Sequence, residues 1–179
     1  MGTNLYAITN YKLTGKETRK DWDAIRAKLG RADLIFTDES YNEEPRWETD
    51  LGSNYEPGLV DYLVCFDHSY GFDVELYPEC AIIGSAYRYW VLNDDFGYGA
   101  EVFQHNYQAL ASALGQNEII YLGDNHTTET TDFLYSAMDG NSYQQIKQQL
   151  QDELGLPLSV NEMRKNPDLI KTRYVSETW

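Results

Sequence analysis

Cations are nearly absent from the middle of this sequence. Between Trp47 and Ile146 there is one, Arg88, against sixteen Asp and Glu. Residues 1–46 hold eight acids and eight bases, and residues 147–179 hold five of each, so the middle segment accounts for the whole net charge of −15. This distribution argues against direct binding of nucleic acid or of an anionic membrane, because Lys and Arg drive both kinds of binding.

Metal-ligating residues are also scarce. The three histidines show none of the pairings that zinc sites use. The run Gly123–His126 is similar to metal-phosphatase loops, but the further ligand motifs of a two-metal centre are missing. The acids around Asp94 and Asp95 lack the alternating oxygen ligands of an EF-hand loop. We therefore expect no metal and no cofactor.

Long hydrophobic runs are missing as well. No window approaches the roughly 18 apolar residues of a membrane span, and the first residues show neither a cationic start nor an apolar signal segment. The two cysteines, Cys65 and Cys80, lie in apolar stretches, which is typical of reduced, buried thiols; a cross-strand disulfide is the alternative. These features predict a cytoplasmic protein that does not bind membranes.

The sequence contains no complete catalytic motif, which favours a protein that is not an enzyme. There is no glycine-rich phosphate loop, Ser85 lacks the second glycine of a nucleophile elbow, and Asp67-His68-Ser69 are too close in sequence to form a triad. A carboxylate-based hydrolase stays open, because acids near Asp94 and near Asp124 are interleaved with aromatic residues that could line a cleft.

Hydrophobic periodicity predicts one α+β domain over residues 1–179, with a mostly antiparallel sheet and three to four packed helices. Expected strands cover residues 5–13, 33–37, 59–66, 72–77, 81–92 and 118–122. Helices are expected after Thr18, around residues 103–114, over 132–138, and after the capping boxes at Ser142 and Ser159. The chain beyond residue 124 is expected to be helical. Residues 38–58 form the least regular stretch and predict a long loop.

Tyrosine is concentrated in the same acidic segment, which contains eleven of the fifteen. Tyr and Trp are favoured at protein interfaces, and carboxylates around them attract a basic partner. Two groups of residues therefore become candidates for partner binding: Glu43, Glu44, Trp47, Glu48, Asp50, Tyr55 and Glu56 in the first, and Asp94, Asp95, Tyr98 and Glu101 in the second.

Several segments resemble small acidic bacterial proteins of toxin–immunity loci. The similar stretches are residues 5–13, Tyr87-Arg88-Tyr89-Trp90, the helix to Leu114 with Gly115, residues 119–125, and residues 143–157. The resemblance implies an immunity-type function, in which the protein neutralises a co-encoded and often cationic toxin. It implies no catalytic residues.

Together these features predict a non-enzymatic inhibitor that binds a basic, toxin-like protein. Carboxylates would pair with the partner's Lys and Arg while aromatic side chains fill its pocket. The alternatives are a DNA mimic that blocks nucleic-acid-binding enzymes, and the carboxylate hydrolase described above. The sequence gives neither the partner's identity nor the oligomeric state.

Overall fold

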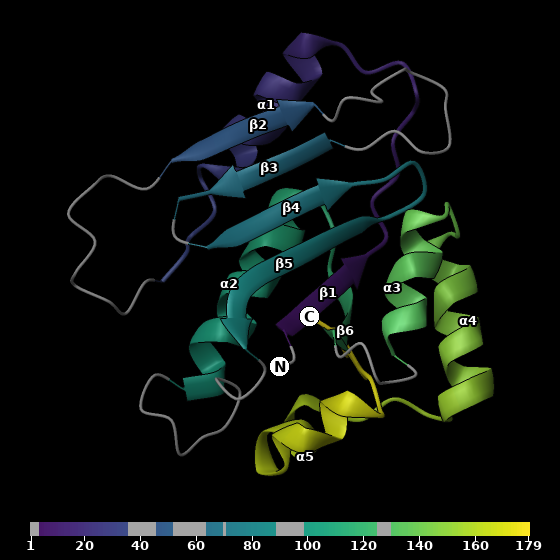
Figure 1. Ribbon diagram of the computed structural model, residues 1–179. Helices are drawn as coiled ribbons and strands as arrows, with labels where there is room; N and C mark the ends of the chain where they lie inside the picture. The colour runs from purple at the N-terminus through teal and green to yellow at the C-terminus, as the bar shows by residue number, and fades with distance from the viewer. Residues whose placement is uncertain (1–3, 36–45, 52–63, 70, 89–98, 125–129) are drawn as a thin grey trace.

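A seven-stranded antiparallel sheet forms the centre of the computed structural model, which describes residues 4–35, 46–51, 64–69, 71–88, 99–124 and 130–179 (Figure 1). The strand order is β2-β3-β4-β5-β1-β6-β7. The bounds are β1 Asn4–Thr9, β2 Trp47–Leu51, β3 Val64–His68, β4 Phe72–Leu76, β5 Ala81–Arg88, β6 Glu118–Asp124 and β7 Val175–Thr178. The antiparallel α+β fold predicted from the sequence is confirmed.

Helices pack on both faces of this sheet, as Figure 1 shows. Their bounds are α1 Arg19–Leu29, α2 Gly99–Ala113, α3 Thr131–Met138, α4 Tyr143–Leu154 and α5 Val160–Lys165, followed by a 3-10 turn over Pro167–Lys171. The capping boxes predicted at Ser142 and Ser159 are present and fix where α4 and α5 begin, and Thr18, predicted as an N-cap, forms a capping box with Asp21 at the start of α1. Helices α1 and α2 lie on what we call the rear face of the sheet, and α3 and α4 lie on the front face.

Each face has its own hydrophobic core. In the rear core, buried residues of α1 and α2 pack against alternate residues of the strands. Those of α1 are Trp22, Ile25 and Leu29, and the strand residues include Phe66 of β3 and Tyr121 of β6. The front core joins α3 and α4 to Ile8, Ile82, Ile120 and Leu122, which lie on β1, β5 and β6. Among the side chains that the structure describes, none from β2, β3 or β4 belongs to the front core. The front helices therefore cover only part of the sheet.

The strand predicted over residues 33–37 is wrong where the structure describes it, because residues 33–35 are irregular. The buried Asn106 of α2 explains the difference. Its side-chain amide accepts a hydrogen bond from the Ile35 backbone N–H at 2.8 Å and donates one to the Ile35 carbonyl at 2.9 Å. A side chain thus satisfies the backbone groups that a neighbouring strand would otherwise pair with.

Two edge strands of the sheet lie where the sequence did not predict strands. Strand β2 lies inside the predicted loop over residues 38–58, and β7 lies in the part of the chain predicted to be helical. In the sheet β2 pairs with β3 and β7 pairs with β6, and Val175 of β7 also forms an isolated parallel bridge with Leu158. Strands of only five and four residues give a weak alternation signal, because few side chains on each face are available to form a pattern.

The remaining expectations about cysteines and membranes have simple outcomes. Both thiols are free, with Cys80 buried and Cys65 half-buried. Among the helices that the structure describes, none is long and apolar enough to cross a bilayer.

Candidate functional site

The part of the front face that the helices leave uncovered is acidic. In β4, Asp73 and Glu75 alternate with the buried Phe72, Val74 and Leu76 of the rear core, so the two carboxylates point to the front. Asp67 of β3 is directly opposite Asp73 in the register, and Glu48 of β2 is directly opposite Asp67. We call Glu48, Asp67, Asp73 and Glu75 the acidic face.

A row of paired residues connects this face to the front core. From β3 to β6 the row runs Asp67, Asp73, Gly84, Tyr6 and Leu122. It therefore passes from two carboxylates, over a residue without a side chain, to an aromatic ring and a buried Leu. The acidic face and the front core meet at Gly84.

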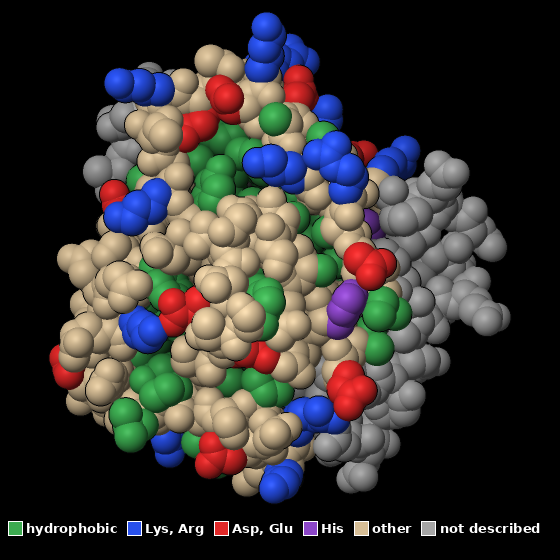
Figure 2. Space-filling model, turned by 180° about the vertical axis from the view of Figure 1, so that it is seen from behind, with side chains coloured by type: hydrophobic (Ala, Val, Ile, Leu, Met, Phe, Trp, Pro, Cys, Tyr) green, Lys and Arg blue, Asp and Glu red, His purple; other side chains and the backbone are tan. Residues whose placement is uncertain are grey.

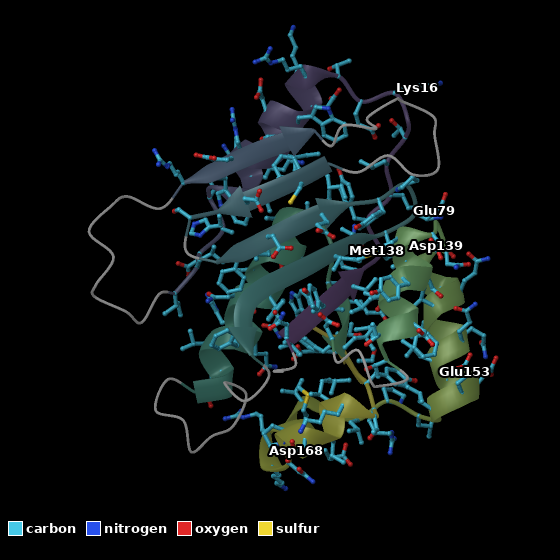
Figure 3. All side chains as sticks on the ribbon, in the orientation of Figure 1. Lys16, Glu79, Met138, Asp139, Glu153 and Asp168 are labelled. Atoms are coloured by element: carbon cyan, nitrogen blue, oxygen red, sulfur yellow. The ribbon has the colours of Figure 1, made fainter. Side chains whose placement is uncertain are left out.

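A cavity of about 280 Å³ lies at this meeting point. Its polar wall contains four carboxylates, those of Asp67, Asp73, Glu75 and Asp124, with Cys65 among them. Its other wall is one side of α3, and Tyr6 lies between the two. The helix residues of the cavity are Thr131, Leu134, Tyr135 and Met138, whose spacing places them on one helical face. Figure 3 shows Met138 at the end of α3 that lies nearest β4 and β5. We call this space the acidic cavity.

Asp73 is the most perturbed carboxylate of the acidic cavity. Burial, together with the charges of Glu75 and Asp67, raises the pKa of Asp73 from 3.8 to about 7. Burial and the charge of Asp67 also raise the pKa of Glu75, although the Tyr77 hydroxyl donates a 2.8 Å hydrogen bond to it. Near neutral pH, this group of acids therefore holds a proton that an isolated carboxylate would have lost.

Gly84 makes room for the Asp73 carboxylate. A Cβ atom added at Gly84 would lie 2.5 Å and 2.6 Å from the two Asp73 carboxylate oxygens. The carboxylate therefore occupies the space over β5 that any other residue at position 84 would fill. Gly84 in this way fixes where the Asp73 charge lies, at the floor of the acidic cavity.

Cations of the flanking segments pair with acids elsewhere on the molecule. Lys12 pairs with Glu79, Lys147 with Glu118, and Arg164 with Glu101. No ion pair among the described residues includes Asp67, Asp73, Glu75 or Asp124. In Figure 2, which shows the rear of the molecule, Lys and Arg gather at the end formed by α1.

Cys65 is a poor nucleophile in this setting. Burial, followed by the charges of Asp67 and Glu75, raises the pKa of the Cys65 thiol far above its usual range. The thiol donates a long 3.5 Å contact to Asp67. Because thiolates and not thiols attack electrophiles, the acidic cavity does not favour cysteine chemistry.

Of the candidate partner-binding residues, four lie in the described part of the chain. Glu48 belongs to the acidic face, and Asp50 lies in β2 opposite Cys65. Trp47 is partly buried against the rear core, with its ring edge-on to His68 at a centroid distance of 4.7 Å. Glu101 is exposed in the first turn of α2, with a carboxylate oxygen 3.4 Å from an Arg164 nitrogen. The other candidates lie outside the described residues: Glu43, Glu44, Tyr55, Glu56, Asp94, Asp95 and Tyr98.

The structure adds residues that the sequence did not single out for binding. Asp67, Asp73, Glu75 and the cavity side of α3 were not among the candidates. The signal for the first three is the alternation of acidic and buried apolar residues along β3 and β4, which marks a sheet face without a hydrophobic cover. The contribution of α3 depends on how the helix packs, which a sequence pattern does not give.

Comparisons with protein-family models, with curated proteins and with solved structures yield no match for this chain. The function therefore has to be argued from the chemistry of the site.

Proposed function

We propose that the protein is a non-enzymatic binding protein whose acidic face docks a basic protein partner. The observation that supports this best is the group of carboxylates at the acidic cavity, none of which is in an ion pair with a described residue. A partner's Lys and Arg would supply the missing positive charges. The expected role is inhibition of a toxin-like cationic protein in the cytoplasm, which the resemblance to immunity proteins also favours.

The mechanism is occlusion of the partner's own binding surface. Long-range attraction by the acidic face speeds the encounter, and short-range pairing of carboxylates with Lys and Arg holds the complex. Such an encounter slows as salt rises, because the Debye length falls from about 10 Å at 0.1 M to about 3 Å at 1 M. No substrate turnover is involved in this mechanism.

A pull-down from the source cells at low and moderate salt tests the proposal. The bait variant removes three carboxylates of the acidic cavity by combining Asp67→Asn, Asp73→Asn and Glu75→Gln. A matched control removes three charges at exposed positions by combining Asp132→Asn, Asp152→Asn and Glu153→Gln. Both triple variants change the net charge by the same amount. We expect one basic protein to be retained by the wild type and the control and lost with the bait variant.

The captured protein is then purified and its activity measured with and without the wild type. Inhibition by the wild type and the control, but not by the bait variant, would support the proposal. Equal retention by both triple variants would refute the acidic face as the site. Capture of many nucleic-acid-binding proteins that elute together as salt rises would instead favour a DNA mimic.

A carboxylate hydrolase is a second candidate, favoured by one observation. Asp73, with a pKa raised to about 7, lies beside Glu75 in a cavity, and acid–base pairs in glycoside hydrolysis have this character. Chromogenic glycosides test it directly. Turnover by the wild type that is lost in Asp73→Asn would establish the hydrolase, whereas no turnover over a broad panel of sugars would exclude it.

A further inference from the structure

The uncovered sheet face ends at α3 in a cavity with two different walls, and this difference indicates what kind of group the cavity holds. One wall presents carboxylates from β3, β4 and β6. The opposite wall presents Leu134 and Met138, which also pack against the front core. A ligand that fits both walls must combine a cationic end with an apolar stem.

Long basic side chains have this composition. The methylene stem of Lys or Arg packs along apolar surface while its charged end stays among polar groups. At about 280 Å³ the cavity lies at the lower end of the range for small-molecule sites and is large enough for one long side chain. The proposed function supplies such a side chain from a basic partner.

A metal ion does not fit the same carboxylates. Among the residues that the structure describes, no group of three or more His, Cys, Asp or Glu is placed so that it could hold a metal ion. The acids come from three strands and are distributed along the cavity wall. A ligand that meets several of them must present several donors over some distance.

A guanidinium group meets this requirement better than an ammonium group. Arg presents five N–H donors in a planar fork, whereas Lys presents a compact and strongly hydrated charge. Removal from water therefore disfavours Lys more than Arg at a half-buried site. The rings of Tyr6 and Tyr135 line the same cavity and offer faces on which a guanidinium can stack.

We infer that the acidic cavity takes an arginine side chain of the basic partner, with the guanidinium among Asp67, Asp73 and Glu75, which lie on the neighbouring strands β3 and β4, and the stem against Leu134 and Met138. The inference rests on the proposed function, because it names which group of the partner the acidic face recognises. Tyr135, which is 50% exposed, also lines the cavity.

Titration with small blocked amino acids tests this inference without the partner. The probes are N-acetyl-arginine methylamide, its lysine counterpart and its uncharged citrulline counterpart. The readout is the NMR signal of the Leu134 and Met138 methyl groups in the full-length protein. We expect the arginine probe to shift both signals and to bind about tenfold more tightly than the lysine probe, the difference that one charged hydrogen bond provides. The citrulline probe should cause no shift.

Variants assign the contacts. Asp73→Asn and Glu75→Gln should each weaken the arginine probe by about tenfold, whereas Asp152→Asn on α4 should leave its affinity unchanged. Tyr135→Ala changes a half-exposed residue, and it should weaken the arginine probe by about threefold through loss of the aromatic ring.

Three outcomes would overturn the inference: equal affinity for the arginine and lysine probes, absence of shifts at Leu134 and Met138, or the same shifts on addition of Mg²⁺ alone. These outcomes are separate from failure of the proposed function. If the triple variant loses the partner while the arginine probe causes no shift, the acidic face binds but the cavity does not take arginine. If the arginine probe binds while the bait variant retains the partner as well as the wild type does, the cavity accepts arginine but is not the docking site.

Discussion

Replacement of Asp73 by Asn should stabilise the protein above neutral pH and leave its stability nearly unchanged below about pH 4. The Asp73 carboxyl has its pKa raised from 3.8 to about 7 in the folded protein. Between these values the folded state binds a proton that the unfolded state has lost. Stability must therefore fall as pH rises through this window, and it levels off above about pH 7.

The size of this effect follows from the shift of the pKa. One pKa unit corresponds to 1.36 kcal/mol, so the full shift amounts to about 4 kcal/mol, of which roughly 2.5 kcal/mol falls between pH 5 and pH 8. Water in the cavity reduces the penalty, so we expect a loss of ~1–2.5 kcal/mol over that range. Asn has the same shape as a protonated Asp and no charge, so the variant should not show this loss.

Urea unfolding at a series of pH values measures the difference. The free energy of unfolding of Asp73→Asn minus that of the wild type should be small below about pH 4, and between pH 5 and pH 8 it should grow by the stated amount. Asp152→Asn, an exposed change on α4, should follow the wild type at every pH. Parallel pH profiles for the wild type and Asp73→Asn would show that Asp73 is not perturbed and would refute the reasoning.

Two further perturbations follow from the same geometry. Gly84→Ala should lower the free energy of unfolding by about 1–3 kcal/mol, because the new methyl group displaces the Asp73 carboxylate. In a double-mutant cycle, Asp73→Ala should recover most of that loss. Additive effects of the two substitutions would show that the two residues do not compete for space. The His68 imidazole, whose pKa burial lowers, should make the protein less stable as pH falls below about 6.5. In His68→Phe this acid-dependent loss, measured by urea unfolding, should disappear, and an unchanged profile would assign the loss to another group.

Local signals in the sequence account for most of the elements. Thr18, Ser142 and Ser159 each precede an acidic or amide residue at the third helical position, and each begins a helix. In β4, the alternation of Phe72, Asp73 and Val74 gives both the strand and its two faces. These signals act within a few residues, so they need no knowledge of the fold.

The site depends on relations between distant segments, which local signals do not contain. In the sheet, β5 lies between β4 and β1, and the register places Gly84 of β5 between Asp73 and Tyr6. Because Gly84 has no side chain, the space between Asp73 and Tyr6 is left open. Acidic alternation in β4 could equally describe a strand with one fully hydrated face. Only the position of α3, which closes a cavity over part of that face, turns the acids into a candidate site.

The free-energy cost of burying the Asp73 carboxylate helps to distinguish a binding cavity from one formed only by packing. The loss of ~1–2.5 kcal/mol expected at Asp73 between pH 5 and pH 8 is a sizeable share of the roughly 5–15 kcal/mol by which a domain is usually stable. A cation bound between Asp73 and Glu75 would remove the repulsion and replace the proton that the acids otherwise hold. Binding of a basic partner is then coupled to proton release, so its affinity increases as pH rises towards 7. A cavity formed only for packing would instead be cheaper with an apolar residue at position 73, since Leu134 and Met138 already provide one apolar wall.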